Sequence, residues 1–443
     1  MTSSNRSEAR ALRPLHFKPL NGVRIVVWSA FALILLVLPL LAQSSFALTL
    51  LCLTGIAAIA CLSYNMLLGQ AGMLSFGHAV YTGLGTFVAI HTMTKIVGGW
   101  PLPMWLVPMV GGFAGLGFGA LFGFVTTRKA GTPFSMITLG VGELVFAGAL
   151  MFPEFFGGEA GINSNRTGGT GWLHDLGLTF GPQIQVYYLI AIYLFICTAA
   201  MYAFTQTPLG RIANAVRDNA ERAEFVGYDT RWVRYLIVMV SSFFAGIAGG
   251  LTALNVEAAT ADLLHGVRSG GYLLFTFLGG VGFFFGPIIG AVLLIFSLVV
   301  LSELTMAWQL YVGVIFLVMV VYAPGGFSAL LMLNLRRVKY GEWRKMRWPY
   351  AGMLFFGLIA MWGIAAIVEM AYQIQVAAGS GSALKIAYIP LDALSASSWV
   401  AAIAVLIVGG AAFEFWRRKF AKVWSEGEER IAEAVKKAEA AIV

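Results

Sequence analysis

Residues 47–67, ALTLLCLTGIAAIACLSYNML, form a predominantly apolar run that contains no charged residue. A helix needs about 20 such residues to cross the hydrocarbon core of a bilayer. The run lies inside a longer stretch, Ile25 to Thr94, that has no Asp, Glu, Lys or Arg at all. We therefore expect this part of the chain to cross a membrane rather than to form the core of a soluble domain.

The whole chain has the composition of a membrane protein. Only 11% of its 443 residues are charged, and its mean hydropathy is +0.81, whereas soluble domains carry about 25% charged residues. Long apolar runs favour helices over a β-barrel, whose strands alternate in short segments. The sequence thus predicts an all-α polytopic membrane protein. Cys52, Cys61 and Cys197 all lie in apolar segments and are expected to be small core residues, not a disulfide or metal set.

The positive charge has a simple interpretation in this class. The net charge is +8, and Lys and Arg collect in the cytoplasmic loops of membrane proteins, where they set orientation. We therefore expect no nucleic-acid partner. The first apolar run follows a basic stretch and is too long for the 7–15-residue core of a signal peptide, so it is interpreted as an uncleaved helix whose N-terminus is cytoplasmic.

Apolar segments predict about 12 transmembrane helices, arranged as a core of about 10, with broken or short helices, and a C-terminal two-helix extension. Counting 271–302 as two short helices, the segments are 23–42, 47–67, 79–97, 103–126, 134–152, 184–204, 232–256, 271–302, 305–323, 350–370 and 398–416. With the N-terminus inside, the basic loops all fall on the cytoplasmic side, as does the C-terminal tail, and the loops assigned outside are poor in Lys and Arg.

A glycine-rich interruption follows the opening run. Residues 69–87, GQAGMLSFGHAVYTGLGTF, hold five glycines and a histidine. Glycine-interrupted apolar segments often mark the substrate path of transporters, because broken backbone is tolerated only where it lines a cavity. If a helix begins near Ser75, one small, polar face carries Ser75, His78, Thr82 and Gly85. The alternative is a tight helix crossing in which a neighbour satisfies His78. A second glycine-rich interruption, 279–290, suggests two related halves.

Glu143 lies in the middle of the apolar segment 134–152. An ionisable group there costs about 2.5–3.5 kcal/mol on insertion scales, so such groups usually face the interior of a helix bundle. Glu143 is therefore a candidate for a translocation path. A hydrogen-bonded carboxyl group at a helix crossing is the structural alternative.

The loop 205–234 predicts an amphipathic helix over 208–226 at the cytoplasmic surface. Thr207 suits the N-cap, Pro208 the first helical position and Gly227 the stop. Apolar residues recur at helical spacing, and charged residues occupy the other faces. The helix is either an ordinary interfacial helix or a docking surface for a cytosolic partner.

Motifs for enzymatic chemistry are absent from the sequence. The chain has no G-x-x-x-x-G-K-[ST] phosphate loop, no cluster with zinc-ligand spacing and no G-x-S-x-G elbow. We therefore expect no enzyme activity, and no cofactor or metal bound by this chain. An intramembrane enzyme would have only His78 and Glu143 as candidate catalytic residues.

Five stretches, in this order, resemble the membrane-spanning permease subunits of branched-chain amino acid ABC importers. They are LSFGHAVYTGLGTF, TLGVGEL followed by FGGEAGI, TPLGRIANAVRDNAERAEFVGYD, LLFTFLGGVGFFFGPIIGA and YAPGGF. Tyr81 and Phe156 stand where the family commonly has Phe and Thr. The resemblance covers about residues 25–330 and leaves 341–443 without a family counterpart.

The resemblance implies the rest of a transport machine. Such a permease pairs with a second homologous permease subunit and with two cytosolic ABC ATPase subunits, which bind the ATP. A periplasmic or extracellular binding protein delivers the substrate, a branched-chain amino acid or a related urea, amide or small carboxylate. The resemblance places this chain in a bacterial inner (plasma) membrane. A secondary transporter of a small solute is the alternative, although it would not need so large a cytoplasmic loop.

The apolar segments, the motifs and the resemblance together assign domains and candidate residues. The domains are a cytoplasmic segment 1–22, a permease core 23–330, a basic cytoplasmic linker 331–349, two extra transmembrane helices in 350–416, and a charged cytoplasmic helix 417–443. The path candidates are Ser75, Gly77, His78, Thr82, Gly85, Glu143, Gly157 and Gly158. The candidates for ATPase coupling are Pro208, Gly210, Arg211, Ala215, Arg217, Asn219 and Gly227.

Overall fold

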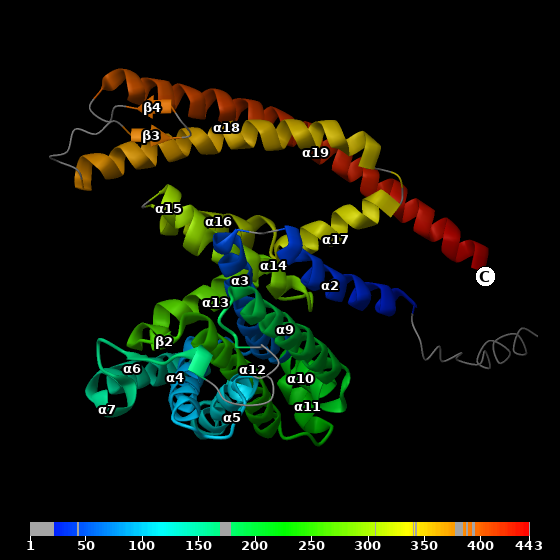
Figure 1. The fold of residues 1–443 in the computed structure, drawn as a ribbon. Coiled ribbons are helices and arrows are strands. Elements are labelled where there is room, and N and C mark those ends of the chain that lie inside the picture. Colours follow the sequence, from blue (N-terminus) through cyan, green and yellow to red (C-terminus); the bar gives the residue numbers. More distant parts are fainter. Residues whose placement is uncertain are drawn as a thin grey trace, which may run out of the picture.

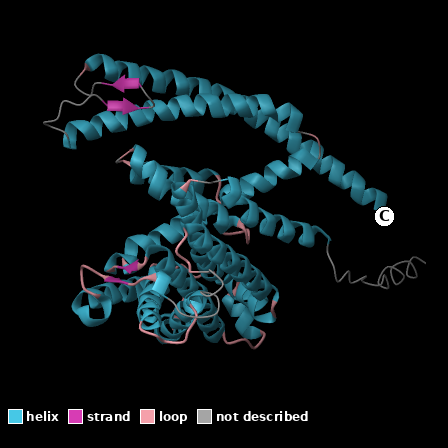
Figure 2. Ribbon diagram, viewed as in Figure 1, coloured by secondary structure: helices cyan, strands magenta, loops and turns pink. Residues whose placement is uncertain are grey.

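A computed structural model describes residues 22–41, 44–168, 179–305, 307–339, 341, 343–376, 384–386, 389–391 and 395–442. The described chain is helical apart from two short antiparallel ribbons (Figure 2), which confirms the predicted all-α membrane class. Nearly all of the predicted N-terminal segment 1–22 lies outside the described residues. The ribbons pair β1 (Ile162–Asn163) with β2 (Ala258–Ala259) and β3 (Leu384–Ile386) with β4 (Ile389–Leu391).

Each predicted apolar segment coincides with a helix. In the first half of the chain these are α2 (Gly22–Leu41), α3 (Ser45–Asn65) with a π-helical turn η1 (Met66–Gln70), α4 (His78–Val97), η2 (Met104–Leu106), α5 (Val107–Thr126), α6 (Thr132–Met151), α7 (Pro153–Phe156), η3 (Arg166–Gly168), α9 (Gln183–Gln206), α10 (Pro208–Asp218) and α11 (Ala220–Phe225). The remainder are α12 (Thr230–Val256), η4 (Ala261–Leu264), α13 (Gly266–Gly279), α14 (Gly286–Ile295), η5 (Phe296–Leu301), α15 (Ser302–Leu304), α16 (Trp308–Tyr322), α17 (Gly326–Lys339), α18 (Trp343–Val376) and α19 (Ala396–Ile442).

Length and hydropathy identify fewer clear spans than the predicted number of about 12. Among the described residues nine helices are long and apolar enough to cross a bilayer, or ten if the pair α16 and α17, bent by 53°, counts as one. The two other predicted segments form α4 and α13. Helix α13 has 14 residues, shorter than a full span, and most residues of α4 are buried inside the protein.

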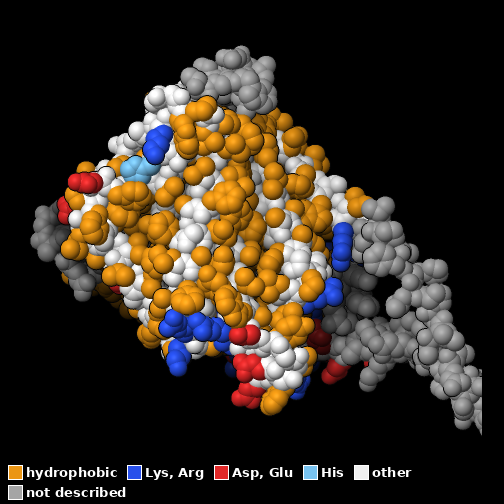
Figure 3. Space-filling model, turned by 90° about the horizontal axis from the view of Figure 1, so that it is seen from below, with side chains coloured by type: hydrophobic (Ala, Val, Ile, Leu, Met, Phe, Trp, Pro, Cys, Tyr) orange, Lys and Arg blue, Asp and Glu red, His pale blue; other side chains and the backbone are white. Residues whose placement is uncertain are grey.

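The segments between the long helices fall into two groups in space. In Figure 1 the α10–α11 loop, α17 and the C-terminal end of α19 lie toward the right, whereas α7, β2, α15 and the β3–β4 ribbon lie toward the left. These two groups of segments thus lie on different sides of the molecule, and which side faces the cytoplasm stays a prediction. Figure 3 shows a face between these ends that is mostly hydrophobic, with charged side chains at its rim, as expected for a surface in contact with lipid.

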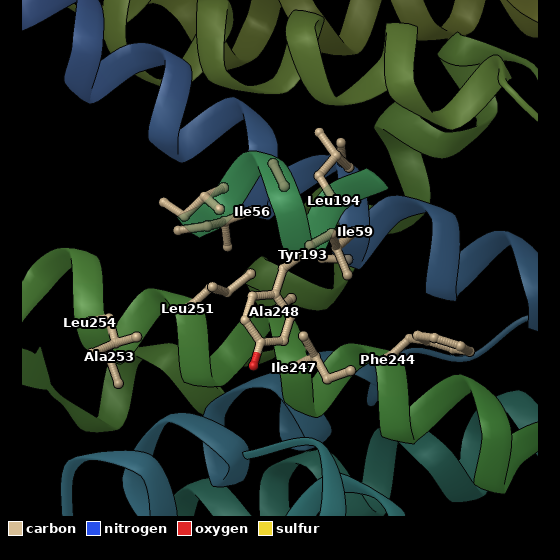
Figure 4. Packing of buried hydrophobic residues seen from close by; sticks show 14 of the residues in the cluster. Ile56, Ile59, Tyr193, Leu194, Phe244, Ile247, Ala248, Leu251, Ala253 and Leu254 are labelled. Carbon is tan, nitrogen blue, oxygen red and sulfur yellow. The ribbon is translucent and has the colours of Figure 1, made fainter. Parts of the chain in front are cut away.

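Helices α3 and α12 form the centre of the core. The second half of α3 is buried from Ile56 onward, and most of α12 is buried between Ser241 and Leu254. Figure 4 shows Ile56 and Ile59 of α3 and Leu194 of α9 close to the buried face of α12. Helix α14 also packs against α3. This core holds the interrupted region after α3 in place.

Small residues allow α5 and α12 to cross closely. A Cβ on Gly111 would lie 2.7 Å from the carbonyl oxygen of Gly246, and one on Gly115 would lie 2.9 Å from the Gly246 Cα. Helices in membranes commonly associate through such small residues at four-residue spacing. Gly111, Gly115 and Gly119 have this spacing in the sequence, a signal that the motif analysis did not use.

The C-terminal extension forms a helical hairpin. Helices α18 and α19 run side by side along one edge of the molecule (Figure 1), and they bury a small cluster of their own around Met370. Helix α18 begins inside the predicted linker 331–349, and α19 continues without a break from the predicted span into the charged tail. The guanidinium group of Arg337 on α17 joins the tail by an ion pair of 2.6 Å with Glu428.

Candidate functional site: an interrupted helix and a cytoplasmic loop

The chain leaves helical geometry between α3 and α4. The π-helical turn η1 ends at Gln70, Gly72 has a positive φ of 66°, and α4 begins at His78 with Gly77 as its N-cap residue. The helix therefore begins at His78, and Ser75 lies before it rather than on a shared helix face with His78 and Thr82. The reason is that the preceding backbone bonds to other helices instead of continuing into α4.

Side chains from neighbouring helices satisfy the backbone of this interruption. The Tyr64 hydroxyl donates to the Ser75 carbonyl at 2.8 Å, and the Ser135 hydroxyl donates to the Leu74 carbonyl at 2.7 Å. The Phe76 N–H donates to the Thr138 hydroxyl at 3.1 Å. Buried backbone groups need such partners, because leaving one unpaired costs about 1–3 kcal/mol. The interruption is thus fastened to α3 and α6.

His78 occupies a buried helix crossing. Its imidazole is 0% exposed, and Nε2 lies 2.9 Å from the Ser63 hydroxyl. The rings of Tyr64, Tyr81 and Tyr272 surround it at centroid distances of 5.1–6.5 Å. A neighbour thus satisfies Nε2, as the packing alternative expects, whereas Nδ1 is buried without a hydrogen-bond partner among the described residues.

The other path candidates on α4 are also buried at crossings. Thr82 donates its hydroxyl to the Ala79 carbonyl within its own helix at 2.9 Å. A Cβ on Gly85 would lie 2.8 Å from the Gly246 Cα, and one on Gly77 would overlap the Thr138 carbonyl oxygen. Within the described chain these residues therefore do not form the open polar face that their spacing suggested.

Glu143 lies on an exposed face of α6. Its Oε1 would be 3.2 Å from a Cβ on Gly266, at the start of α13. The nearby His265 ring packs edge-on against Phe146 at 4.9 Å. Glu143 is the ionisable residue of α6, and contact of its carboxylate with lipid would be costly.

Gly157 and Gly158 form a turn at the end of the α6–α7 unit. Their φ angles are 76° and 65°, and Gly157 is the left-handed cap of α7. A Cβ on Gly157 would lie 2.8 Å from the Ile162 side chain. The turn therefore belongs to the same loop as β1, away from the buried group around His78.

The loop 205–234 contains two helices rather than the single helix expected over 208–226. Helix α10 ends at Asp218, and Asn219 adopts an extended φ of −159° before α11 begins. The side chain of Asn219 accepts the Arg222 N–H at 2.9 Å and so caps α11. The prediction is wrong at this residue because an Asn side chain can satisfy a new helix start.

The predicted start and stop signals are present in the structure. The Thr207 hydroxyl accepts the Gly210 N–H at 3.2 Å, Pro208 is the first residue of α10, and Gly227 follows α11 with φ 97°. A side chain on Gly210 would meet the Thr205 Cα at 2.9 Å, so this glycine allows the close approach of α9 and α10. Arg211 and Ala215 are exposed on α10.

An apolar tip on this loop was missed by the sequence reasoning. Phe225 is 91% exposed and Val226 is 71% exposed, next to the Gly227 stop. An exposed apolar patch rimmed by charges is typical of an interaction site. The signal was available in the sequence as a bulky apolar pair directly before the stop glycine.

Arg217 is exposed on α10, as expected, and its side chain also reaches the interruption. Its side chain is 38% exposed and forms a 2.9 Å ion pair with Asp218, and its guanidinium group also donates to the Gly69 carbonyl in η1. The loop therefore contacts the interruption directly. Among the described residues, no three His, Cys, Asp or Glu side chains lie close enough to hold a metal ion.

The helical fold, the interruption inside the bundle and the loop 205–234 fit a membrane-spanning component of a transport system. Residues 46–323 match the family described as branched-chain amino acid transport system / permease component. This match covers more than half of the chain, so the protein belongs to that family. The chain is thus the non-catalytic permease of an ABC transporter, in which partner subunits hydrolyse ATP.

Similar curated proteins have related names. The chain is 26% identical to the high-affinity branched-chain amino acid transport system permease protein LivM of Escherichia coli (strain K12), over 62% of this chain and 68% of that protein. It is 25% identical to LivM of Salmonella typhimurium, over 66% and 71%. It is 28% identical to the autoinducer 2 import system permease protein LsrC of Escherichia coli O157:H7, over 32% and 43%. The search of solved structures found no significant match.

Proposed function

We propose that this protein forms one half of the translocation path of an ATP-driven importer for branched-chain amino acids or a related small polar solute. Family membership supports the permease role, and the two LivM relatives favour an amino acid substrate. The observation that carries the proposal is the cytoplasmic loop, which presents an exposed apolar tip and contacts the interrupted helix on its inner side. A secondary transporter has no need for this combination.

We place the path along the exposed face of α6. Glu143 needs a polar environment, and a second permease subunit or a water-filled path beside it would supply one. In this arrangement the turn at Gly157 and Gly158 lies near the outer entrance. A buried group does not line this path but fixes the interruption against α6 and α12. The group consists of Ser75, Gly77, His78, Thr82 and Gly85.

The proposed assembly has the partners usual for this kind of machine. Two ATPase subunits dock at the cytoplasmic loop, and a periplasmic or extracellular binding protein approaches the opposite end. Both termini are placed in the cytoplasm of a bacterium, and the helices in the inner membrane. The basic residues at the α10, α17 and α19 ends support this orientation.

The apolar tip provides a test of docking. Phe225→Ala should lower the amount of ATPase subunit that co-purifies with the permease, because it removes an aromatic side chain of the kind that dominates interfaces. The loss of binding free energy should be about 1–3 kcal/mol. Trp100→Ala, which alters a 49% exposed ring placed at the opposite end of the membrane, is the control. Equal co-purification of the two variants would count against docking at α10 and α11.

The substrate requires a reconstituted system. The purified chain alone should not hydrolyse ATP above background. With its partner permease, ATPase subunits and binding protein in proteoliposomes, hydrolysis should rise when leucine, isoleucine or valine is added. Stimulation by urea, an amide or a small carboxylate, and not by these amino acids, would agree with the proposed permease role but contradict the proposed substrate. Hydrolysis by the chain alone would contradict the non-catalytic role.

A further inference from the structure

We infer that Arg217 and Asn214 fasten α10 to the interruption after α3, so that the cytoplasmic loop and this interruption move as one body during transport. The inference rests on the proposed coupling role of the loop and adds the route by which a movement of the loop enters the membrane. It assigns Arg217 and Asn214 as positioning residues, which act through the interruption rather than on the substrate.

Two polar contacts join the elements. The Arg217 guanidinium group donates to the Gly69 carbonyl, and the Asn214 side-chain amide donates to Gln70 Oε1 at 3.0 Å. The Arg217 Nε also donates to Asp218 at 2.9 Å, which holds the guanidinium group in this orientation. Hydrogen bonds that involve a charged group are stronger than neutral ones. The contacts therefore resist a relative sliding of α10 and η1.

The aliphatic part of Arg217 fits against Gly72. A Cβ at this glycine would lie 2.7 Å from the Arg217 Cγ, and the φ of 66° is itself one that favours glycine. The turn is thus shaped for close contact with α10. A hinge that allowed free movement between the two elements would not need such a close approach.

An apolar layer surrounds these contacts. Ala213 and Val216 of α10 belong to a buried cluster that also contains Leu67, Ala71 and Met73 of the interrupted region. This cluster is distinct from the main core around α3 and α9. Because interiors are close-packed, a displacement of α10 must carry the residues of this cluster with it.

The interruption passes the displacement on to other helices. Tyr81 of α4 lies in the same buried cluster, and its ring is 5.9 Å from that of His78. On the opposite side, a Cβ on Gly69 would lie 2.9 Å from the carbonyl oxygen of Val281, in the turn between α13 and α14. One contact point, Gly69, thus connects α10 with both glycine-rich interruptions of the chain.

The first test separates positioning from docking. Arg217→Ala in the complete reconstituted transporter should leave co-purification of the ATPase subunits and their basal hydrolysis in place. It should lower the solute transported per ATP hydrolysed by about tenfold, as expected for the loss of a charge-assisted hydrogen bond. Arg217→Lys, which keeps a cationic donor, should recover part of this ratio. Phe225→Ala should behave in the opposite way, with less co-purification but a normal ratio in the complexes that remain.

The second test does not depend on the stability of an Arg217 variant. A Gln70→Cys, Asn214→Cys double variant can be joined by a short bis-methanethiosulfonate linker, because the native Cys52, Cys61 and Cys197 are all buried. Uptake should be retained after linking, and each single variant treated in the same way serves as the control. Loss of uptake on linking would overturn the inference, since the two elements would then have to separate in each cycle.

The remaining outcomes are also decisive. An unchanged transport ratio in Arg217→Ala would overturn the inference, and so would a loss of ATPase co-purification, which would place Arg217 in the docking surface. If the ATPase subunits fail to co-purify with the unaltered chain, the proposed docking itself is wrong. Failure of the inference about Arg217 can therefore be distinguished from failure of the proposed docking.

Discussion

Replacing Ala215 with proline should abolish coupled transport while the protein still reaches the membrane. Ala215 lies inside α10, where proline removes a backbone hydrogen bond and clashes with the preceding turn, at a cost of about 3 kcal/mol. Its side chain is exposed, so the change does not create a cavity. We expect co-purification of the ATPase subunits and substrate-stimulated hydrolysis to fall to background, because a broken α10 no longer presents the docking surface of the loop.

Ala220→Pro is the matched control. Ala220 is the first residue of α11 and follows Asn219, whose extended backbone is compatible with a following proline. This variant should therefore keep its ATPase subunits and its uptake. If Ala215→Pro transports as well as Ala220→Pro, the loop is only a connector, and coupling must be sought elsewhere, for example at the basic stretch 333–349.

Adding a single methyl group at Gly77 should be almost as damaging. The Cβ of Gly77→Ala would overlap the carbonyl oxygen of Thr138, and a backbone carbonyl in α6 cannot rotate away as a side chain can. Overpacking of this kind typically costs about 1–3 kcal/mol. We expect a lower Tm in detergent and uptake reduced by about tenfold or more, because the contact between the interruption and α6 must open.

Gly313→Ala tests whether the effect is specific to this contact. Gly313 lies in α16 with no atom within 4 Å of a Cβ placed on it, so the methyl group meets open space. This variant should have an unchanged or slightly higher Tm, because alanine favours a helix by about 1 kcal/mol over glycine. A normal Tm and normal uptake for Gly77→Ala would contradict this prediction, because the contact with α6 would then accommodate a methyl group.

The sequence predicted the helices well because their signal is local. Apolar runs, the Thr207 cap, the first-position Pro208 and the Gly227 stop depend only on neighbouring residues, and all of them appear in the structure. The break at Asn219 was missed because apolar periodicity continues through it from α10 into α11. The extended backbone of Asn219 and its capping bond to the Arg222 N–H show that a new helix begins.

The candidate site was harder to predict than the helices, because residues that line a path and residues that pack at a helix crossing are of the same amino-acid types. A face of Ser, His, Thr and Gly suits both a polar path and a close helix crossing, and spacing does not distinguish them. The structure buries His78 among three tyrosines and leaves Glu143 exposed. That difference depends on how α6, α12 and α13 pack around α4, which the local sequence does not encode. The contact of Arg217 with Gly69, 148 residues apart in the chain, is a long-range feature of the same kind.

The most direct test of the central claim is solute uptake into proteoliposomes that contain this chain with its partner permease, ATPase subunits and binding protein. We expect uptake only when ATP is available to the ATPase subunits, and none when ATP is replaced by a proton or sodium gradient. Omission of the ATPase subunits should stop uptake completely. Uptake driven by an ion gradient without ATP, or uptake by this chain alone, would contradict the account.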